Sequence, residues 1–331
     1  MMSKFLKTAL CAVVSVIAIG QPTSSFAQTM WKGYTFFSAA NHPDFQHLEK
    51  MANEFTRLGE GRIQTKVNVG GSLPIPATAV TQAVGEGTLT FAHDGFFTGN
   101  LPIGALPTLP LLMPTHQDFL KAMEILEPYL AAELDKKGVK LLATYNFPLQ
   151  TIWSVSKLTS TADLKGKKMR VANIPVSDFM RRFEATPVTL GTPDVAPALE
   201  RSTIEGLVTA SAGGGRLWGD MLKYNYRLGL YYDPMLVIVN KAAFEKLSPE
   251  MQQKFRDAAR KDAAELTQEL AASEDDVTQQ LKAKGMVVTV PNDEARKQAA
   301  ARVRDYWDQW AKSTGPDAVQ ALTKIRAAIG Q

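Results

Sequence analysis

Histidines, cysteines and carboxylates in close spacing are the residues that most often bind metals or catalyse reactions. The four histidines of this chain are His42, His47, His93 and His116, and none has a second ligand at helical or turn spacing. The pattern therefore predicts neither a zinc nor an iron site. The chain also lacks a Gly-x-Ser-x-Gly elbow and a Walker loop. This weakens the case for an enzyme without excluding one, because catalytic carboxylates need no local motif.

A run of three glycines, Gly213 to Gly215, resembles part of a phosphate-binding loop. It lacks the flanking spacing and the acidic partner of a dinucleotide fingerprint. A flexible loop is the better interpretation.

The strongest chemical candidate is Arg170, which lies on a strand predicted for residues 168–172. A guanidinium presents a planar fork of donors that matches the two oxygens of a carboxylate, and the pair is strengthened in a water-poor cleft. The alternative is a surface arginine at the end of a strand. The residue types alone do not decide between a ligand-binding arginine and a surface arginine.

The elements that must position these residues alternate between strands and helices. The first half contains expected strands at 30–38, 63–69, 89–92 and 139–145 and expected helices at 43–58, 77–84 and 117–137. A second unit has expected strands at 168–172, 188–190 and 205–209 and expected helices at 177–184 and 194–200. Such alternation is typical of largely parallel sheets covered by helices. Two successive units predict a two-lobed α/β protein with a ligand cleft between the lobes.

A long helix begins after an apolar strand at 234–240, with Ser248 as N-cap and Pro249 at its first position. It can continue to Lys284, a length on the order of 50 Å, so we expect it to span both lobes. A strand at 286–290 and helices at 293–312 and 316–329 close the chain. The expected domains are 28–146 (first lobe), 147–234 (second lobe), 235–275 (return to the first lobe) and 276–331 (second lobe and closing helices).

The first 27 residues have the order of a secretory signal. Lys4 and Lys7 precede an apolar run at 8–19 that is too short to cross a bilayer, and a polar stretch ends at Ala27. We expect cleavage after Ala27 and export. The only cysteine, Cys11, lies inside this segment, so the mature protein would have no thiol.

Composition argues against several partners. The formal charge is +4 for the whole chain, and without Lys4 and Lys7 it is +2, spread without a basic block. Nucleic acid is therefore a poor candidate partner. The remaining chain has no apolar run of membrane-spanning length, which predicts a soluble protein. Its roughly 300 residues predict two domains. We also expect a monomer without a cofactor.

Several short motifs occur in a fixed order. They are Lys-Gly-Lys-Lys-Met-Arg-Val-Ala-Asn at 165–173, Ala-Thr-Pro-Val at 185–188, Ala-Leu-Glu at 198–200 and Ile-Glu-Gly at 204–206. In this order they resemble the solute-binding proteins of tripartite ATP-independent periplasmic (TRAP) transporters, the dicarboxylate-type, DctP-like family. Further matches are Asn-His-Pro at 41–43, Gly-Arg-Ile at 61–63, Leu-Pro-Leu at 109–111 and Leu-Ser-Pro at 247–249, so the resemblance covers nearly all of the mature chain.

The resemblance implies a periplasmic-binding-protein fold, in which each lobe is a mixed, mostly parallel sheet with flanking helices. It also implies a periplasmic protein that passes a small organic acid to the membrane subunits of a transporter and is not an enzyme. In that family the arginine of Lys-x-Arg-Val forms a bidentate salt bridge with the ligand carboxylate, and this position is Arg170 here.

The sequence departs from the sugar-acid binders of that family at three places. Their second cleft arginine has no counterpart in residues 146–153. Their Gln-Glu-Asn is replaced by Leu207-Val208-Thr209, and an acidic residue is replaced by His93. These changes predict a less polar pocket. The expected ligand is a monocarboxylate with an apolar or aromatic body, such as a 2-hydroxy, 2-oxo or aryl acid.

Aromatic residues collect at the positions expected to line the pocket, although burial in the core is the alternative for each of them. Trp218 and Tyr231 stand out, because their polar tips can hydrogen-bond a ligand. The aromatic candidates are Phe96, Phe147, Trp153, Trp218, Tyr231 and Tyr232. The predicted ligand-binding residues are Arg170, His93, Phe96, Trp153, Asn173, Thr209, Trp218 and Tyr231.

Two other functions remain open at this point. One is a secreted enzyme that uses Glu205, Asp233 or His93 as acid or base. The other is a sensor protein that presents its ligand to a receptor kinase.

Overall fold

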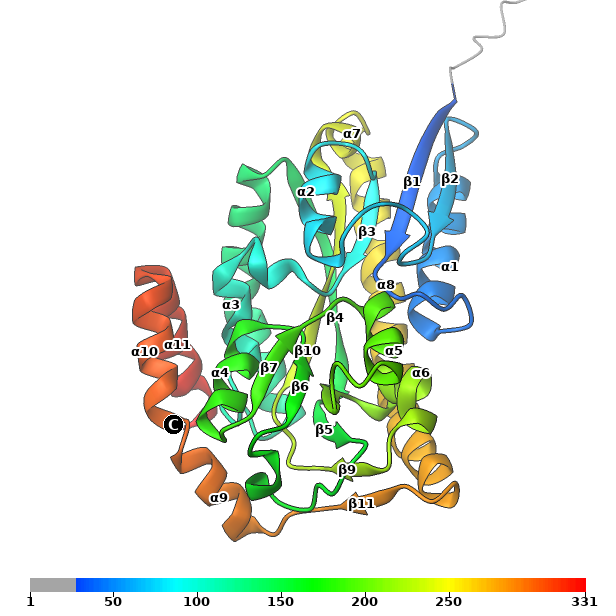
Figure 1. The fold of residues 1–331 in the computed structure, drawn as a ribbon. Coiled ribbons are helices and arrows are strands. Elements are labelled where there is room, and N and C mark those ends of the chain that lie inside the picture. Colours follow the sequence, from blue (N-terminus) through cyan, green and yellow to red (C-terminus); the bar gives the residue numbers. More distant parts are fainter. Residues whose placement is uncertain (1–27) are drawn as a thin grey trace, which may run out of the picture.

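The computed structural model describes residues 28–331, and the predicted signal segment at 1–27 lies outside them. The described chain forms two lobes, each built on one mixed sheet with flanking helices (Figure 1). The predicted two-lobed α/β fold is confirmed.

The first lobe contains a five-stranded sheet of order β2-β1-β3-β10-β4. β1 is parallel to both of its neighbours, whereas β10 is antiparallel to both β3 and β4. The strands are β1 (Thr29–Thr35), β2 (Ile63–Asn68), β3 (Phe91–Asp94), β4 (Val139–Leu149) and β10 (Tyr232–Asn240). The helices are α1 (Pro43–Leu58), α2 (Val80–Gly85), α3 (His116–Lys136) and α7 (Lys241–Glu245).

The second lobe contains a six-stranded sheet of order β11-β9-β5-β8-β6-β7. β6 is parallel to β7 and β8, while β5 is antiparallel to β8 and β9. The strands are β5 (Thr151–Ser154), β6 (Lys168–Val171), β7 (Thr186–Thr189), β8 (Gly206–Thr209), β9 (Tyr224–Tyr226) and β11 (Val287–Thr289). The helices are α4 (Ile174–Arg182), α5 (Thr192–Glu200), α6 (Arg216–Trp218) and α9 (Asp293–Ala301).

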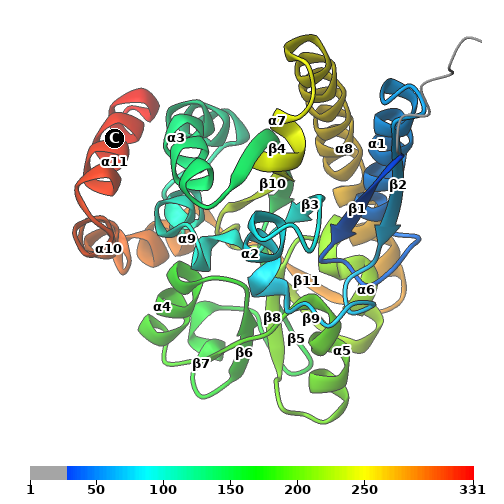
Figure 2. The same ribbon diagram turned by 90° about the horizontal axis from the view of Figure 1, so that it is seen from above.

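The long helix α8 (Pro249–Ala283) joins the two lobes, as predicted. Ser248 caps it by accepting a hydrogen bond from the backbone N–H of Met251. Its apolar stripe stacks Phe255 on Phe55 of α1, with ring centroids 4.4 Å apart, and continues to Leu281 beside the second lobe. Figure 2 shows α8 and α1 on one side of β4 and β10, with α3 on the other.

The chain crosses between the two sheets at three places. β4 of the first sheet leads directly into β5 of the second, and the return passes through Tyr231 into β10. The third crossing is α8, which contacts β4 in the first lobe and residues 211–215 in the second.

The helix expected at 293–312 is two helices, which corrects the prediction. α9 ends at Ala301 and α10 (Arg304–Thr314) begins at Arg304, because Arg302 and Val303 turn the chain and bury Val303 completely. α11 (Pro316–Ile329) then packs against α3 of the first lobe, where the Tyr129 hydroxyl donates to Gln320.

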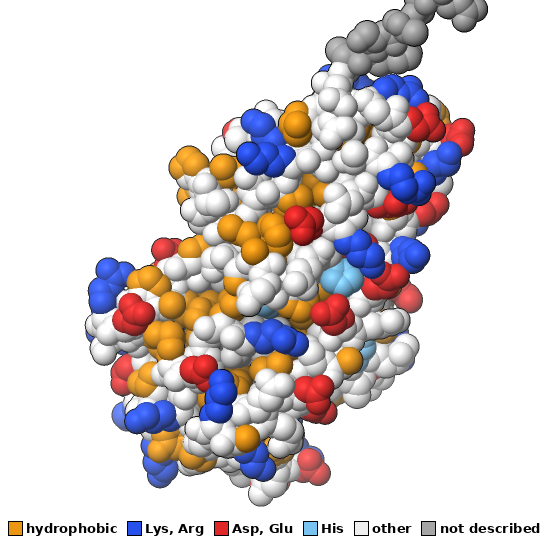
Figure 3. Space-filling model, turned by 90° about the vertical axis from the view of Figure 1, so that its right-hand side faces the viewer, with side chains coloured by type: hydrophobic (Ala, Val, Ile, Leu, Met, Phe, Trp, Pro, Cys, Tyr) orange, Lys and Arg blue, Asp and Glu red, His pale blue; other side chains and the backbone are white. Residues whose placement is uncertain are grey.

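The surface carries charges of both signs. On the face shown in Figure 3, lysine and arginine side chains are interspersed with aspartate and glutamate around smaller apolar patches. Within residues 28–331, no helix has the length and hydropathy needed to cross a membrane.

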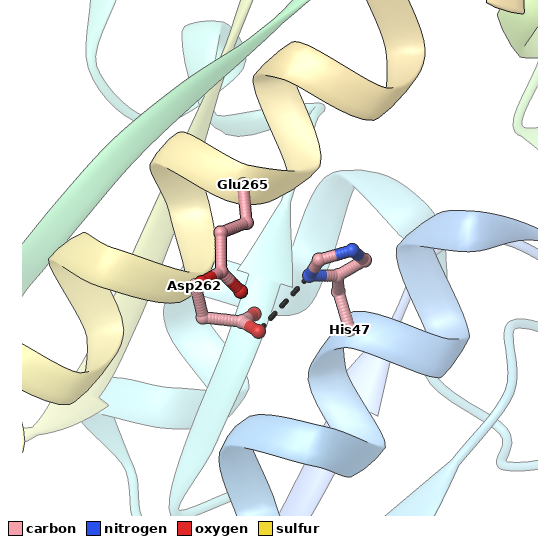
Figure 4. Close-up of side chains that lie close together, drawn as sticks. All are labelled: His47, Asp262 and Glu265. Carbon is pink, nitrogen blue, oxygen red and sulfur yellow. Dashed lines mark hydrogen bonds and ion pairs between the residues drawn. The ribbon is translucent and has the colours of Figure 1, made fainter.

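An ion-pair network joins α1 to α8. His47 Nδ1 lies 2.9 Å from Asp262 Oδ1, beside Glu265 (Figure 4). Its Nε2 lies 3.2 Å from Glu269 Oε2, and Lys50 pairs with Glu265. The hydrogen bond to Asp262 and the one to Glu269 raise the pKa of His47 above 6.5, against the opposing effect of burial.

This raised pKa predicts that the contact of His47 with α8 stabilises the folded protein more at low pH than at high pH. A group whose pKa is raised on folding contributes its full stabilisation at pH values below its unfolded-state pKa, which is 6.5 for histidine. This contribution is lost as the pH rises through the folded-state pKa. We therefore expect His47→Ala to lower the melting temperature more at pH 6 than at pH 9. Asp262→Asn should remove most of the same pH dependence. A melting-temperature difference that stays constant between pH 6 and pH 9 would contradict this assignment.

Candidate functional site

A small cavity of about 40 Å³ lies between the two lobes. Both sheets and the crossings between them contribute to its wall. The lining residues are Phe36, Phe37, Gly95, Phe96, Phe147, Gln150, Arg170, Ala172, Thr192, Val208, Thr209, Gly213, Gly214, Trp218, Tyr231, Asp233 and Met235. Arg170 and Asp233 are the charged residues of this wall.

Arg170 is the cation of the cavity. It projects from β6, is 5% exposed, and donates from Nε to the carbonyl oxygen of Leu190 at 2.9 Å. Its guanidinium carbon lies 5.8 Å from the ring centroids of both Phe96, from the first lobe, and Trp218, from the second. Within residues 28–331 it forms no ion pair.

Burial lowers the pKa of Arg170 to about 10, although Tyr231 and Asp233 oppose this effect. The side chain therefore stays cationic at neutral pH. A desolvated cation held by one hydrogen bond and two ring faces has lost much of its hydration. Such a group is well suited to bind an anion that enters the cavity.

Asp233 is the acid of the same cavity. It is half-buried at the start of β10, and its carboxylate has no hydrogen bond or ion pair in the part of the chain that the structure describes. Withdrawal from bulk water raises its pKa to about 7, against the opposing effect of Arg170. At neutral pH this carboxyl group exists in both protonation states.

Two hydroxyl groups of the wall can each donate a hydrogen bond to a ligand. The Tyr231 hydroxyl accepts from Asn173 Nδ2 at 3.2 Å, and the Thr209 hydroxyl accepts from the Gly214 backbone N–H at 2.9 Å. Neither has an acceptor for its own hydrogen among the described residues. Burial raises the pKa of Tyr231 well above its usual value, so its hydrogen is retained at neutral pH.

Asn173 lies behind the wall, although it was predicted to bind the ligand. Its Oδ1 caps α4 by accepting from the Val176 backbone N–H at 3.1 Å, and its Nδ2 holds Tyr231. The side chain is thus occupied by the fold. Its contribution to the site is to orient Tyr231.

The three glycines form a buried turn, which corrects the expectation of a flexible loop. Residues 211–215 are all buried, and the backbone N–H of Ala212 donates to Glu274 Oε2 at 2.8 Å. A Cβ on Gly214 would lie 2.2 Å from the Trp218 ring. Glycine is required there because the ring that faces Arg170 packs directly on the backbone.

His93 and Trp153 were also predicted to bind the ligand, and the structure places both outside the cavity wall. His93 Nδ1 lies 3.3 Å from Asp44 Oδ1, in a buried group in which Asp44 also accepts hydrogen bonds from Thr35 and Tyr145. Trp153 is in the core and donates from Nε1 to the carbonyl oxygen of Thr209 at 2.9 Å. Trp153 therefore supports the wall from behind.

The structure brings five of the eight predicted residues together: Arg170, Phe96, Thr209, Trp218 and Tyr231. Sequence reasoning missed Gln150, a buried polar residue at the β4–β5 crossing. It lies in the segment where the resemblance to sugar-acid binders would place a second arginine. Asp233 had been considered only as the acid or base of an enzyme.

One cluster outside the cavity has the residue types of a metal site. Possible ligand atoms of His47, Asp262 and Glu265 lie within 4.8 Å of one another. Lys50 already supplies a positive charge there, since its ammonium pairs with Glu265 and lies 3.7 Å from Asp262. A network of ion pairs explains this cluster without a metal.

Residues 35–313 match the family model of bacterial extracellular solute-binding proteins, family 7 (DctP). The chain belongs to this family. The predicted resemblance to the DctP-like family of solute-binding proteins is thereby confirmed. Members of this family bind solutes for transport and are not classed as enzymes.

Three relatives illustrate the similarity. The 2,3-diketo-L-gulonate-binding periplasmic protein of Escherichia coli (strain K12) is 28% identical over 72% of this chain and 74% of its own length. An extracytoplasmic solute receptor of Bordetella pertussis that binds pyroglutamic acid is 26% identical, with a TM-score of 0.83 over 90% of this chain and 99% of its own. A TRAP periplasmic solute-binding protein of Ralstonia eutropha H16 with bound (S)-2-acetolactate has the same fold, at 22% identity and a TM-score of 0.83, covering 91% of this chain and 98% of its own.

Proposed function

We propose that this DctP-family protein captures a small monocarboxylate in the cavity between its lobes and delivers it to the membrane subunits of a TRAP transporter. The observation that carries the proposal is Arg170, a desolvated cation without a carboxylate partner among residues 28–331. A ligand carboxylate supplies that partner. The hydroxyl groups of Tyr231 and Thr209 are available to donate to the same anion.

The charges and the apolar surface of the cavity wall favour a ligand with one carboxylate over a ligand with two. The wall contains one arginine, and the neutral Gln150 occupies the segment in which a second arginine is absent. The remaining surface is largely aromatic and aliphatic, including Phe36, Phe147 and Met235. Burying a second carboxylate against such a wall would be costly, because no further cation is present in it.

Closure of the two lobes would complete the site. Phe96 comes from the first lobe and Trp218 from the second, so the two rings can face Arg170 together only when the lobes are closed. We propose a hinge at the crossings near residues 150 and 231 and along α8, with the domain division 28–146, 147–234, 235–275 and 276–331. We also propose that the signal segment is removed after Ala27 and that the mature protein acts in the periplasm.

A thermal-shift panel of small acids tests this function. An acid present at 100 times its dissociation constant stabilises the folded state by about 2.7 kcal/mol. For a chain of this length that corresponds to a rise in melting temperature of about 5 °C. The bound acid should be recovered chemically unchanged after denaturation, as a transport protein requires. If a broad panel of monocarboxylates produces no shift, or if the recovered acid has been converted, the proposed function is wrong.

A further inference from the structure

Asp233 is the one charged group of the cavity wall whose role is not explained by holding a carboxylate. A carboxylate is repelled by an anionic ligand, and yet Asp233 lines the same cavity as Arg170. The two side chains interact electrostatically but do not form an ion pair. In the described residues no N–H or O–H group donates a hydrogen bond to Asp233.

The neighbours of Asp233 offer no other use for its carboxylate. The ionisable groups that interact with it electrostatically are Arg170 on β6, Tyr231 beside it and Tyr145 on β4. The Tyr145 hydroxyl donates to Asp44, and Arg170 Nε donates to Leu190. The Asp233 carboxylate lines the cavity and accepts from no group of the described chain, so it is free to accept a hydrogen bond from a donor on the bound molecule.

We propose that Asp233 accepts a hydrogen bond from an N–H or O–H group that lies next to the ligand carboxylate, and that it thereby selects acids with such a donor over 2-oxo acids. This inference rests on the proposed function, in which Arg170 holds the carboxylate. A 2-oxo acid would place a carbonyl oxygen, which can only accept, against the Asp233 carboxylate. This narrows the predicted ligand class to 2-hydroxy acids and to acids with an N–H on the same carbon, such as pyroglutamate.

Two matched ligand pairs test the selection by titration calorimetry at pH 8. Pyroglutamate is compared with 3-oxocyclopentane-1-carboxylate, in which a methylene replaces the N–H, and L-lactate is compared with pyruvate. A site that accepts a hydrogen bond from its ligand strongly rejects an analogue that lacks the donor group. In whichever pair binds, we therefore expect the acid with the N–H or O–H group, the donor acid, to bind at least about 100-fold more tightly than its analogue. Equal affinity within a pair that binds would overturn the inference and leave the proposed function standing.

Asp233→Asn provides the matched variant. Its amide nitrogen donates, so the preference for the donor acid should shrink by more than tenfold, and pyruvate should bind more tightly than it does to the unaltered protein. The fold should be unaffected, because the half-buried carboxylate of Asp233 makes no hydrogen bond or ion pair with the rest of the described chain. If the Asn variant keeps the original preference, Asp233 does not select the ligand.

The pH dependence of binding gives an independent measurement. A donor acid requires the ionised form of Asp233, whose pKa lies at about 7 in the unliganded protein, so its affinity should fall about tenfold from pH 8 to pH 6. Arg170 and Tyr231 do not titrate in this range, and neither does His42, which stacks on Phe37 of the wall and has its pKa lowered to about 4 by burial. The Asn variant should show no such slope. If none of the four acids binds through Arg170, the proposed function fails together with the inference. Binding of both acids of a pair with equal affinity, in contrast, contradicts only the inference about Asp233.

Discussion

Replacing Arg170 by Ala is expected to weaken binding of the ligand acid by at least about 100-fold, because removing one partner of a buried, hydrogen-bonded charge pair costs about 3–5 kcal/mol. The fold should survive. Arg170 makes one hydrogen bond to protein, to the Leu190 carbonyl, and its burial is itself unfavourable for a cation. The melting temperature of the unliganded variant should therefore equal or exceed that of the unaltered protein.

Two companion variants separate charge from geometry. Arg170→Lys keeps the charge but loses the planar donor fork, so its affinity should lie between those of the unaltered protein and the Ala variant. Arg181→Ala removes an exposed arginine of α4 that pairs with Asp178, and it should bind normally. Calorimetry that finds unchanged affinity in the Ala variant would exclude the assigned role of Arg170.

Replacing Glu274 by Ala is expected to destabilise the folded protein strongly. Glu274 Oε1 lies 3.0 Å from Arg227 Nη2, and its Oε2 accepts from the backbone N–H of Ala212 in the buried glycine turn. The Glu274 and Arg227 side chains are 10% and 19% exposed, so the variant would leave a largely buried guanidinium without its carboxylate. We expect a loss of about 3 kcal/mol in the free energy of unfolding and a fall in melting temperature of about 6 °C.

The same substitution should weaken ligand binding indirectly, because the turn that Glu274 anchors carries Gly213 and Gly214 into the cavity wall. Asp220→Ala is the matched control. It removes an exposed carboxylate that pairs with Lys284, and such surface pairs contribute little. Changing Glu274 and Arg227 together to Leu and Met should recover much of the lost stability. If Glu274→Ala melts like the unaltered protein, the network does not support the turn.

Much of the fold follows from local patterns in the sequence. α8 was predictable to within a residue, because Ser248 and Pro249 mark its start and its apolar spacing is regular. β5 and β9 were missed, since four residues and three residues respectively are too few to show a period. The break near Val303 was also missed, because a buried valine in a turn has no distinctive local pattern.

The residues of the candidate site were predicted from two kinds of signal. Arg170 came from its place in Lys-x-Arg-Val, and Trp218 and Tyr231 came from their polar tips. Asn173 was predicted to bind the ligand. The sequence alone does not distinguish an asparagine that caps a helix from one that binds a ligand, because the backbone conformation decides between the two. Asp233 and Gln150 have no local signal, since they reach the cavity only through the crossings that join the two sheets.

A crystal structure of the protein with its acid bound would show directly whether Arg170 holds the ligand. We expect the ligand carboxylate to lie between the lobes, with its oxygens about 2.8 Å from the terminal nitrogens of Arg170. The Phe96 and Trp218 rings should still face the guanidinium. An acid bound elsewhere, or one whose carboxylate does not contact Arg170, would contradict the proposed capture of a carboxylate by this arginine.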